Sequence, residues 1–516
     1  MRIRPTWLAL AILGVAAVAH VVLVLSIVDV RGALDHDEII SHLAATGHLD
    51  DWPSAAEKPP AGTWVTGAEA HRFLETDAGS SLGETRSNLE ERDIHPPLYF
   101  WTLLGAREAG LGILWSGPVL NLAAVLLAGA LLFLLLKAEL DDPVLAALGT
   151  AVFALTPALI RSTGYARQYP FMMLAAVALI WVTVRLRERP TSPLHLAAFV
   201  AIGAFGLLSG VAFATAIIGA VVVVASRWFR DIRAMASIVG AAAASGLVAL
   251  AVFPGYGEQL SRARTIADNT RSSPLTRARD WGEGFFDLVT NESAVDRMLL
   301  PVALVGGLVL VATIPWWYRS AWDAIRTRPI AITALGVGGI ALFGATAAYL
   351  LSSSPAHARG WQYIILFWPS IVLLGAVLVR GRPHARLGLF VVAALLGAYA
   401  WQWLRLTDDN FAAQRRAVTA LSDATLVVAD CPMRGFTPGA AMWLPDDAHF
   451  LLGTRGTAQP PPEPPDADAS APYLLHADGC RPPVDVQPVL RQLGLERGAR
   501  IGPVGSIDVF RLERAG

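Results

Sequence analysis

The chain carries little charge for its length. Asp, Glu, Lys and Arg make up only 16% of its 516 residues, whereas a soluble globular domain carries about 25%. The formal net charge is −1, which gives no electrostatic basis for a polyanionic partner, and no feature indicates nucleic-acid binding. Lysine occurs only at Lys58 and Lys137. We ascribe this preference for arginine to genome composition rather than to chemistry.

What the chain has instead is apolar residues gathered in blocks. Five blocks contain no charged residue at all: 118–136, 143–160, 298–315, 329–349 and 387–404. A further apolar run, Trp7 to Val28, follows Met-Arg-Ile-Arg and lacks a small-residue cleavage site after it, so we interpret it as an uncleaved anchor. Because about 20 apolar residues are needed to cross a 30 Å hydrocarbon core, the pattern predicts a polytopic α-helical membrane protein.

Arginine clusters set the expected topology. Short Arg-rich loops stay in the cytoplasm, so four clusters and the N-terminus are placed inside; they are 185–189, 227–233, 319–328 and 380–386. The acidic segment KAELDD at 137–142, which this topology also places inside, fits the rule poorly. The 37 uncharged residues between Arg189 and Arg227 must then form two shorter helices, broken near Ser209-Gly210. The expected location is the plasma (inner) membrane.

Eleven spans follow from this topology. They are 7–28, 118–136, 143–160, 170–184, 194–208, 211–226, 234–253, 298–315, 329–350, 361–379 and 387–404. We therefore expect a membrane domain over 1–405, with 29–117 as a long first external loop, and a small soluble α/β domain over 406–516 outside. The tail has strand-like runs at 425–429, 473–476 and 507–512, and a Pro-rich PPPEPP stretch. It also holds Cys431 and Cys480, for which an external disulfide is the favoured state and two free buried thiols the alternative.

The first external loop begins with the acidic stretch LDHDEIISH, residues 34–42. Glu38 and His42 are four residues apart and share one helical face. Asp37 at the membrane surface suits a general base or an oxygen ligand for a divalent metal. The alternative is a solvated helix start, where acids favour the helix dipole. The loop holds five of the chain's eleven histidines, but they lack the tight spacing of a zinc site.

Three more polar segments fall on the external side. In DIHPPLYFW (93–101), Asp93 and His95 precede a proline-initiated helix from Leu98 that we expect on the membrane surface. In RSTGYARQYPF (161–171), arginine and tyrosine suit either a phosphate clamp or interfacial anchoring; the residues are Arg161, Tyr165, Arg167 and Tyr169. In HARGWQY (357–363), Arg359 and Tyr363 allow the same two interpretations. Four such segments on one face favour a polar cavity that opens outward.

These segments resemble the GT-C glycosyltransferases, specifically the protein O-mannosyltransferase and aminoarabinose transferase group. The similar features are Asp-Glu after the first span, His-Pro-Pro-Leu-Tyr near the end of the first loop, the pattern Pro157, Ile160, Arg167, Tyr169, and Arg-Gly-Trp-Gln-Tyr before a late span. They occur in the same order over residues 1 to about 400, whereas the tail does not contribute.

The resemblance implies an inverting transfer of a sugar from a polyprenyl-phosphate donor to a protein, lipid or glycan acceptor on the extracytoplasmic face. It implies Asp37 as general base or metal ligand, supported by Glu38, with His95 and Asp93 lining the pocket. Arg167 and Arg359 would hold the carrier phosphate. This chain departs from the aminoarabinose branch, because Tyr169 stands near the position of a second acid, which puts a two-acid metal site in doubt. Lys58, in EKPP, is a further candidate for the site.

Rival functions make different demands on the sequence. A transporter needs charged residues or broken helices near the bilayer midplane, whereas the spans here are nearly free of charge. A non-catalytic envelope assembly or sensor protein would tolerate the loss of Asp37. An oligosaccharide ligase or polymerase of related fold would differ mainly in its acceptor.

Overall fold

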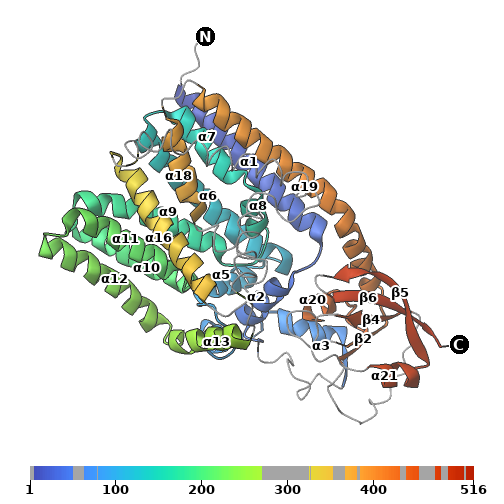
Figure 1. The fold of residues 1–516 in the computed structure, drawn as a ribbon. Helices are drawn as coiled ribbons and strands as arrows, with labels where there is room; N and C mark the ends of the chain where they lie inside the picture. The colour runs from blue at the N-terminus through green and yellow to red at the C-terminus, as the bar shows by residue number, and fades with distance from the viewer. Residues whose placement is uncertain are drawn as a thin grey trace.

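The structure is a computed structural model of the full chain. It describes residues 5–49, 63–77, 79–269, 273, 325, 327–351, 367–380, 384–430, 437–452, 471–477, 486–504 and 507–515. Figure 1 shows an elongated bundle of helices with a β-sheet at one end. The described part of the chain is mostly helical.

The apolar runs form helices where the structure describes them. Five are long and apolar enough to cross a bilayer: α1 (Pro5–Arg31), α6 (Ile113–Leu140), α9 (Tyr169–Glu188), α12 (Ile232–Val252) and the first part of α19 (Ala385–Ser422). Four shorter apolar stretches accompany them: α10 (Pro193–Ser209), α11 (Phe213–Trp228), the part Pro329–Leu342 of α16 (Pro329–Leu351), and α18 (Trp368–Val379). The expected span 298–315 lies outside the described residues. The predicted break near Ser209-Gly210 is confirmed, because α10 ends at Ser209 and α11 begins at Phe213.

One predicted span needs correction. The run 143–160 is not one straight helix but α7 (Pro143–Ala154) and α8 (Pro157–Thr163), which meet at an angle of 61°. Pro157 is the physical cause, since proline lacks the N–H that would continue the ladder and its ring clashes with the preceding turn. The bend directs α8 and the turn 164–168 toward the N-terminus of α2.

Helix α9 lies in the middle of the bundle. Its packing partners include α6, α10, α11 and α16, and its buried residues include Met173, Val177 and Ile180. At the end of α6, Asp141 pairs with Arg380 at 3.0 Å and Asp142 with Arg386 at 2.9 Å. The acidic 137–142 segment therefore lies at the same end of the bundle as the basic cluster 380–386.

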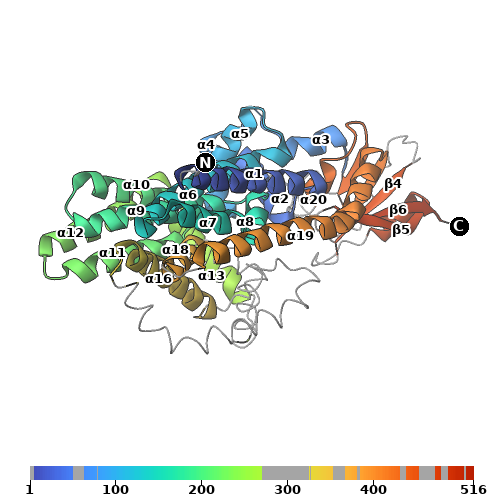
Figure 2. The same cartoon turned by 90° about the horizontal axis from the view of Figure 1, so that it is seen from above.

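The first external loop folds into short helices at the opposite end of the bundle. They are α2 (His36–Thr46), α3 (Gly67–His71), α4 (Leu82–Arg92) and α5 (Leu98–Glu108), with a 3-10 turn η1 (Arg72–Leu74) between them. The expected helix from Leu98 is confirmed as α5. Helix α13 (Tyr256–Asn269) comes from a later loop and packs against α4. Figure 2 shows the molecule from above, with the helical bundle and the sheet toward opposite ends.

A six-stranded sheet joins this end. Its order is β1-β3-β2-β4-β6-β5, with β1 (Trp64–Thr66), β2 (Leu426–Ala429), β3 (His449–Leu452), β4 (Pro472–His476), β5 (Leu495–Val504) and β6 (Ile507–Arg514). Strand β2 is parallel to β3 and β4, and the other pairs are antiparallel. The strand-like runs predicted in the tail are confirmed as β2, β4 and β6. Two short helices, α20 (Thr437–Ala441) and α21 (Gln487–Gln492), accompany the strands.

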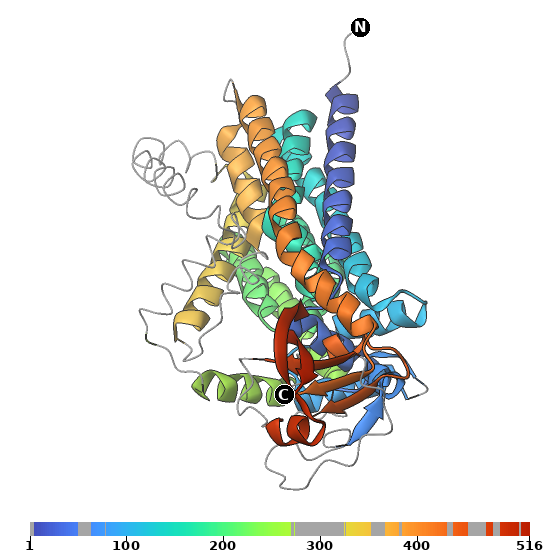
Figure 3. The ribbon, with the colours of Figure 1, turned by 90° about the vertical axis from the view of Figure 1, so that its right-hand side faces the viewer.

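Two features connect the sheet to the rest of the chain. Strand β1 comes from the first external loop and pairs with β3, with Trp64 opposite Leu451. Helix α19 continues from the bundle to Ser422 without a break and lies along α1, as Figures 1 and 3 show. One face of the sheet buries Val427 and Phe450 in a common core with Ile39 and Leu43 of α2. The division at residue 406 thus falls inside a helix, and we retain it as a proposal.

Candidate active site

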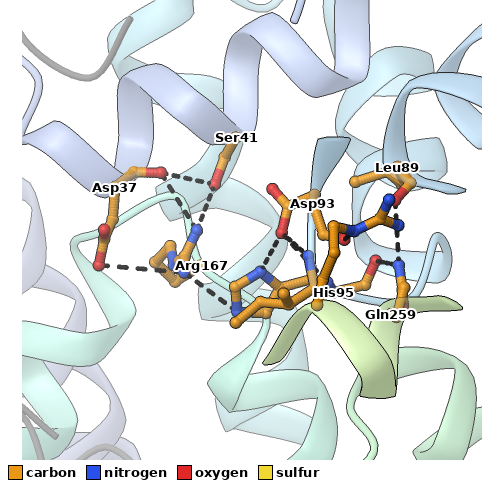
Figure 4. Close-up of polar contacts among 9 residues, drawn as sticks. Asp37, Ser41, Leu89, Asp93, His95, Arg167 and Gln259 are labelled. Atoms are coloured by element: carbon orange, nitrogen blue, oxygen red, sulfur yellow. Dashed lines mark hydrogen bonds and ion pairs between the residues drawn. The ribbon is translucent and has the colours of Figure 1, made fainter. Parts of the chain in front are cut away.

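Asp37 and Arg167 meet at the end of the bundle that carries α2 and the turn before α9. Arg167 Nη2 lies 3.9 Å from Asp37 Oδ2, and Arg167 Nη1 donates to the Asp37 carbonyl and to Ser41 Oγ, each at 3.2 Å (Figure 4). Asp37 is in the first turn of α2, whereas Arg167 is in the turn between α8 and α9. The Asp37 side chain keeps 19% of its surface exposed. The fold therefore brings a partly accessible carboxylate beside a guanidinium from a separate predicted segment.

His95 and Asp93 complete a line of polar groups. His95 Nδ1 lies 2.6 Å from Asp93 Oδ1, and His95 Nε2 lies 3.3 Å from Arg167 Nη2 (Figure 4). A guanidinium can only donate, so Nε2 of His95 must accept, and Nδ1–H then donates to the Asp93 carboxylate. This hydrogen-bond pattern assigns a neutral imidazole to His95. The four side chains therefore contact one another in a line, in the order Asp37, Arg167, His95, Asp93.

The electrostatics of this line favour the charged forms of Asp93 and Arg167. Burial alone would raise the pKa of Asp93, but His95, Arg167 and the Ile94 N–H hold it well below its ordinary value. Burial opposes the charged form of Arg167, yet Asp37, Tyr169 and Asp93 raise its pKa above the ordinary value. Arg167 is therefore a permanent buried cation, held where negative charge is expected to develop in the proposed reaction.

Glu38, adjacent to Asp37, has a different environment. Its side chain is fully buried, and Oε2 lies 2.5 Å from Arg31 Nη1. The Asp35 N–H donates to Oε2 at 2.9 Å, which closes a capping box on α2, and the Ala166 N–H donates to Oε1 at 2.8 Å. Burial raises the pKa of Glu38, while Arg31 and both N–H groups oppose that shift. Glu38 thus ties the end of α1 and the start of α2 to the turn that carries Arg167.

Arg31 is the residue of this group that the sequence analysis missed. Its guanidinium lies over the Tyr165 ring, 4.6 Å from the centroid, and its carbonyl accepts from Gln414 of α19 at 2.7 Å. Tyr165 also contacts Arg161, at 5.8 Å. Arg31 ends an apolar helix, where arginine is ordinary at a membrane boundary, so its sequence position alone gave no signal of the buried pair.

Helix α13 supports the segment that carries Asp93 and His95. Gln259 donates to the carbonyls of Leu89 at 3.3 Å and His95 at 2.8 Å (Figure 4). Arg262 donates to the carbonyls of Glu90, Glu91 and Asp93. The sequence analysis missed both residues, although their i, i+3 spacing puts them on one helical face.

The remaining predicted site residues have separate places. Tyr169 is buried at the start of α9 and bonds Arg167. His42 shares the buried face of α2 with Glu38, as expected. Burial, together with Arg107 and Arg31, lowers the pKa of His42 to about 3. The other predicted residues lie outside the described part of the chain: Lys58, Arg359, Tyr363, Cys431 and Cys480.

The described residues around Asp37 do not make up a divalent metal site. A guanidinium stands beside the carboxylate, where a second acid would be needed. The histidines of the first loop are dispersed, with His48 facing Asp77 and His71 facing Asp446. Within the described ranges no group of three or more His, Cys, Asp or Glu side chains has the arrangement of a metal site. We therefore route no step of the proposed reaction through a metal.

Comparison with known proteins gives a fold but no sequence match. No protein-family model matches the chain, and no curated protein matches it. Among solved structures it resembles ArnT from Cupriavidus metallidurans in the apo state, with a TM-score of 0.51 and 13% identity over 97% of each chain. The same protein bound to undecaprenyl phosphate gives a TM-score of 0.51 and 12% identity over 98% of each chain.

A weaker likeness is to the Archaeoglobus fulgidus oligosaccharyltransferase in complex with Zn and sulfate. Its TM-score is 0.43 and its identity 14%, over 85% of this chain and 62% of that chain. The chain described here has a GT-C-like fold.

Proposed function

We propose that the protein is a glycosyltransferase that takes a sugar from a polyprenyl-phosphate donor. The observation that carries the proposal is the pairing of a partly exposed carboxylate, Asp37, with a buried cation, Arg167. The fold shared with ArnT, one structure of which contains undecaprenyl phosphate, supports this choice of donor. The site would face the extracytoplasmic side of the inner membrane, with the N-terminus in the cytoplasm.

In the proposed reaction, the acceptor hydroxyl oxygen attacks the anomeric carbon of the donor sugar. A new glycosidic C–O bond forms while the bond from the anomeric carbon to the phosphate oxygen breaks, and the configuration inverts. Asp37 takes the hydroxyl proton as general base. The polyprenyl phosphate leaves with the bonding electron pair, and Arg167 stabilises its growing negative charge. Arg359 is a second proposed phosphate ligand.

The other residues have positioning roles in this proposal. His95, held by Asp93, contacts Arg167 from the side away from Asp37. Glu38 and Arg31 fix the backbone on either side of Asp37 and Arg167. We propose positioning rather than proton transfer for Glu38, because its side chain is fully buried and both its oxygens already accept hydrogen bonds.

The test uses purified protein, a panel of radiolabelled polyprenyl-phosphate sugars, and a membrane extract as the acceptor source. Transfer by the wild type is expected to fall about 10²–10⁴-fold in Asp37→Asn, the contribution typical of a general base. Asp423→Asn, an exposed carboxylate at the end of α19, is the matched control and should transfer at the wild-type rate. Undiminished transfer by Asp37→Asn would remove Asp37 from the chemistry, and donor binding without any transfer would favour a non-catalytic function.

A further inference from the structure

A cavity with charged and apolar walls lies at the end of the bundle opposite Asp37. It has a volume of about 560 Å³ and lies where α6 and α9 end and α16 begins. Arg167 immediately precedes the first turn of α9, whereas Arg185 and Glu188, which line the cavity, are in its last turn. A helix of 20 residues is about 30 Å long. The two sites are therefore separated by about the thickness of a hydrocarbon core.

The cavity has an apolar part and a charged part. Apolar side chains from all three helices line it, including Leu134, Leu135, Trp181, Val184 and Ile330. Its charged lining consists of two arginines and two glutamates, namely Arg185, Arg328, Glu139 and Glu188. The lining therefore has no net charge but offers separate sites for an anionic and a cationic group. An apolar wall below a charged rim at helix ends matches the boundary between acyl chains and headgroups.

Glu139 is the residue in this cavity whose bonding is incomplete. It is only 3% exposed, and its Oε1 has no hydrogen-bond donor among the described residues. Among the described residues, Arg328 Nε lies 3.8 Å from Oε1, beyond hydrogen-bond distance, and the Ile330 N–H is a further partner of the carboxylate. A buried carboxylate oxygen without a donor is costly. A ligand that supplies an N–H at this point would remove that cost.

We propose that this cavity binds a phospholipid whose headgroup carries a primary ammonium group. The ammonium would donate to Glu139 Oε1, and the phosphate would lie between Arg185 and Arg328. The acyl chains would follow Leu134, Leu135 and Ile330 into the bilayer. A choline headgroup has no N–H to donate, and a glycerol headgroup would leave a net negative lipid beside two glutamates. The site is distinct from the proposed donor site and does not depend on the glycosyltransferase function.

The experiment compares three lipids with identical acyl chains, bearing ethanolamine, choline or glycerol headgroups. Each is added to the full-length protein in detergent, and binding is followed by native mass spectrometry and by the shift in Tm. The ethanolamine lipid should bind about tenfold more tightly than the other two, the difference expected for one hydrogen bond to a charged group. Equal binding of the ethanolamine and choline lipids, or preferred binding of the glycerol lipid, would overturn the proposal.

Glu139→Gln tests the ammonium contact. Arg328 and Arg380 donate to the backbone carbonyl of Glu139, at 3.3 and 2.8 Å, and the substitution leaves those bonds intact. The variant should lose the preference for ethanolamine, while Glu108→Gln, on an exposed residue at the other end of the bundle, should keep it. A retained preference in Glu139→Gln would contradict the proposal. If that variant does not fold, Arg185→Gln gives the answer, since it should weaken phosphate binding for all three lipids, and unchanged binding would contradict the site.

Discussion

Asp37 and Glu38 are adjacent carboxylates in one turn of α2 with opposite environments. Glu38 is fully buried and lies 2.5 Å from Arg31, and two backbone N–H groups also donate to it. Asp37 is partly exposed, and its ion pair with Arg167 is 3.9 Å long. The comparison teaches that the first turn of a helix can bury one acid, Glu38, in contacts that hold neighbouring elements together, and leave the preceding acid, Asp37, partly exposed. Consecutive residues point about 100° apart on a helix, which makes this separation possible.

The largest expected effect is on stability, from Glu38→Gln. The change leaves Arg31 buried without its counter-charge, a loss of about 3–5 kcal/mol for a broken buried pair. Asp37→Asn should cost less than about 1 kcal/mol, because its pair is longer and partly exposed. The measurement is the Tm of each purified variant. A double variant, Arg31→Gln with Glu38→Gln, should recover part of the loss; equal Tm values for the two single variants would contradict the comparison.

The second effect is on transfer, from Arg167→Lys. Lysine keeps the charge but lacks the planar fork that contacts the Asp37 carbonyl, Ser41 and His95 together. We expect the rate of sugar transfer to fall about 100-fold, as for loss of one preorganised charge-stabilising donor. Arg86→Lys is the control, since Arg86 lies on α4 outside the proposed site and pairs with Glu90 at 3.0 Å. A variant at 167 as active as the control would remove Arg167 from phosphate stabilisation.

Asp93→Asn should have a smaller effect on the same reaction. The carboxylate accepts from the Ile94 and His95 N–H groups and holds the His95 ring. An amide in its place weakens that hold, so we expect transfer to fall about tenfold, at the low end of orientation effects. The pH profile of transfer separates this role from a structural one, because it should change in Asp93→Asn and stay unchanged in Gln259→Ala, which removes only backbone contacts.

The smallest effect concerns His42 and depends on pH. Its pKa of about 3 in the folded protein lies below the ordinary value of 6.5. The unfolded chain therefore binds one more proton between these values, and stability falls as the pH drops through that window. The slope is at most about 1.4 kcal/mol per pH unit. Tm measured from pH 7.5 to 5 should fall less steeply in His42→Leu than in the wild type; parallel curves would show that His42 is not buried in the neutral form.

The sequence predicted best what depends on local pattern. The charge-free runs that the structure describes became helices. Arginine parity located the break between α10 and α11, because two clusters on the same side of the membrane exclude one long helix between them. Pro157 is a sequence signal for the bend, but the length of the apolar run 143–160 led to the prediction of one span. Arginine parity placed the segments of Asp37, Asp93, His95 and Arg167 on one side and favoured a shared cavity, and the resemblance supplied their roles. The structure brings these four side chains together.

What the sequence did not predict depends on contacts between different elements of the fold. Arg31 pairs with Glu38 only because α2 turns back on α1, and Gln259 reaches His95 across 164 residues. Neither contact can be predicted from the spacing of the two residues or from the composition of the segments around them. Strand β1 is the extreme case, since three residues, Trp64–Thr66, gain their regular structure only from pairing with β3.

That pairing has a consequence for how the protein is made. Strand β1 is synthesised early, but its partner, His449–Leu452, emerges nearly four hundred residues later. At about 5–20 residues per second, the first external loop waits for tens of seconds before its edge strand has a neighbour. During that interval Trp64 and Val65 lack their native partners in a crowded compartment. Ribosome stalling or truncation before residue 449 should therefore leave the proposed active-site loop incompletely folded, even when every earlier span is already in the bilayer.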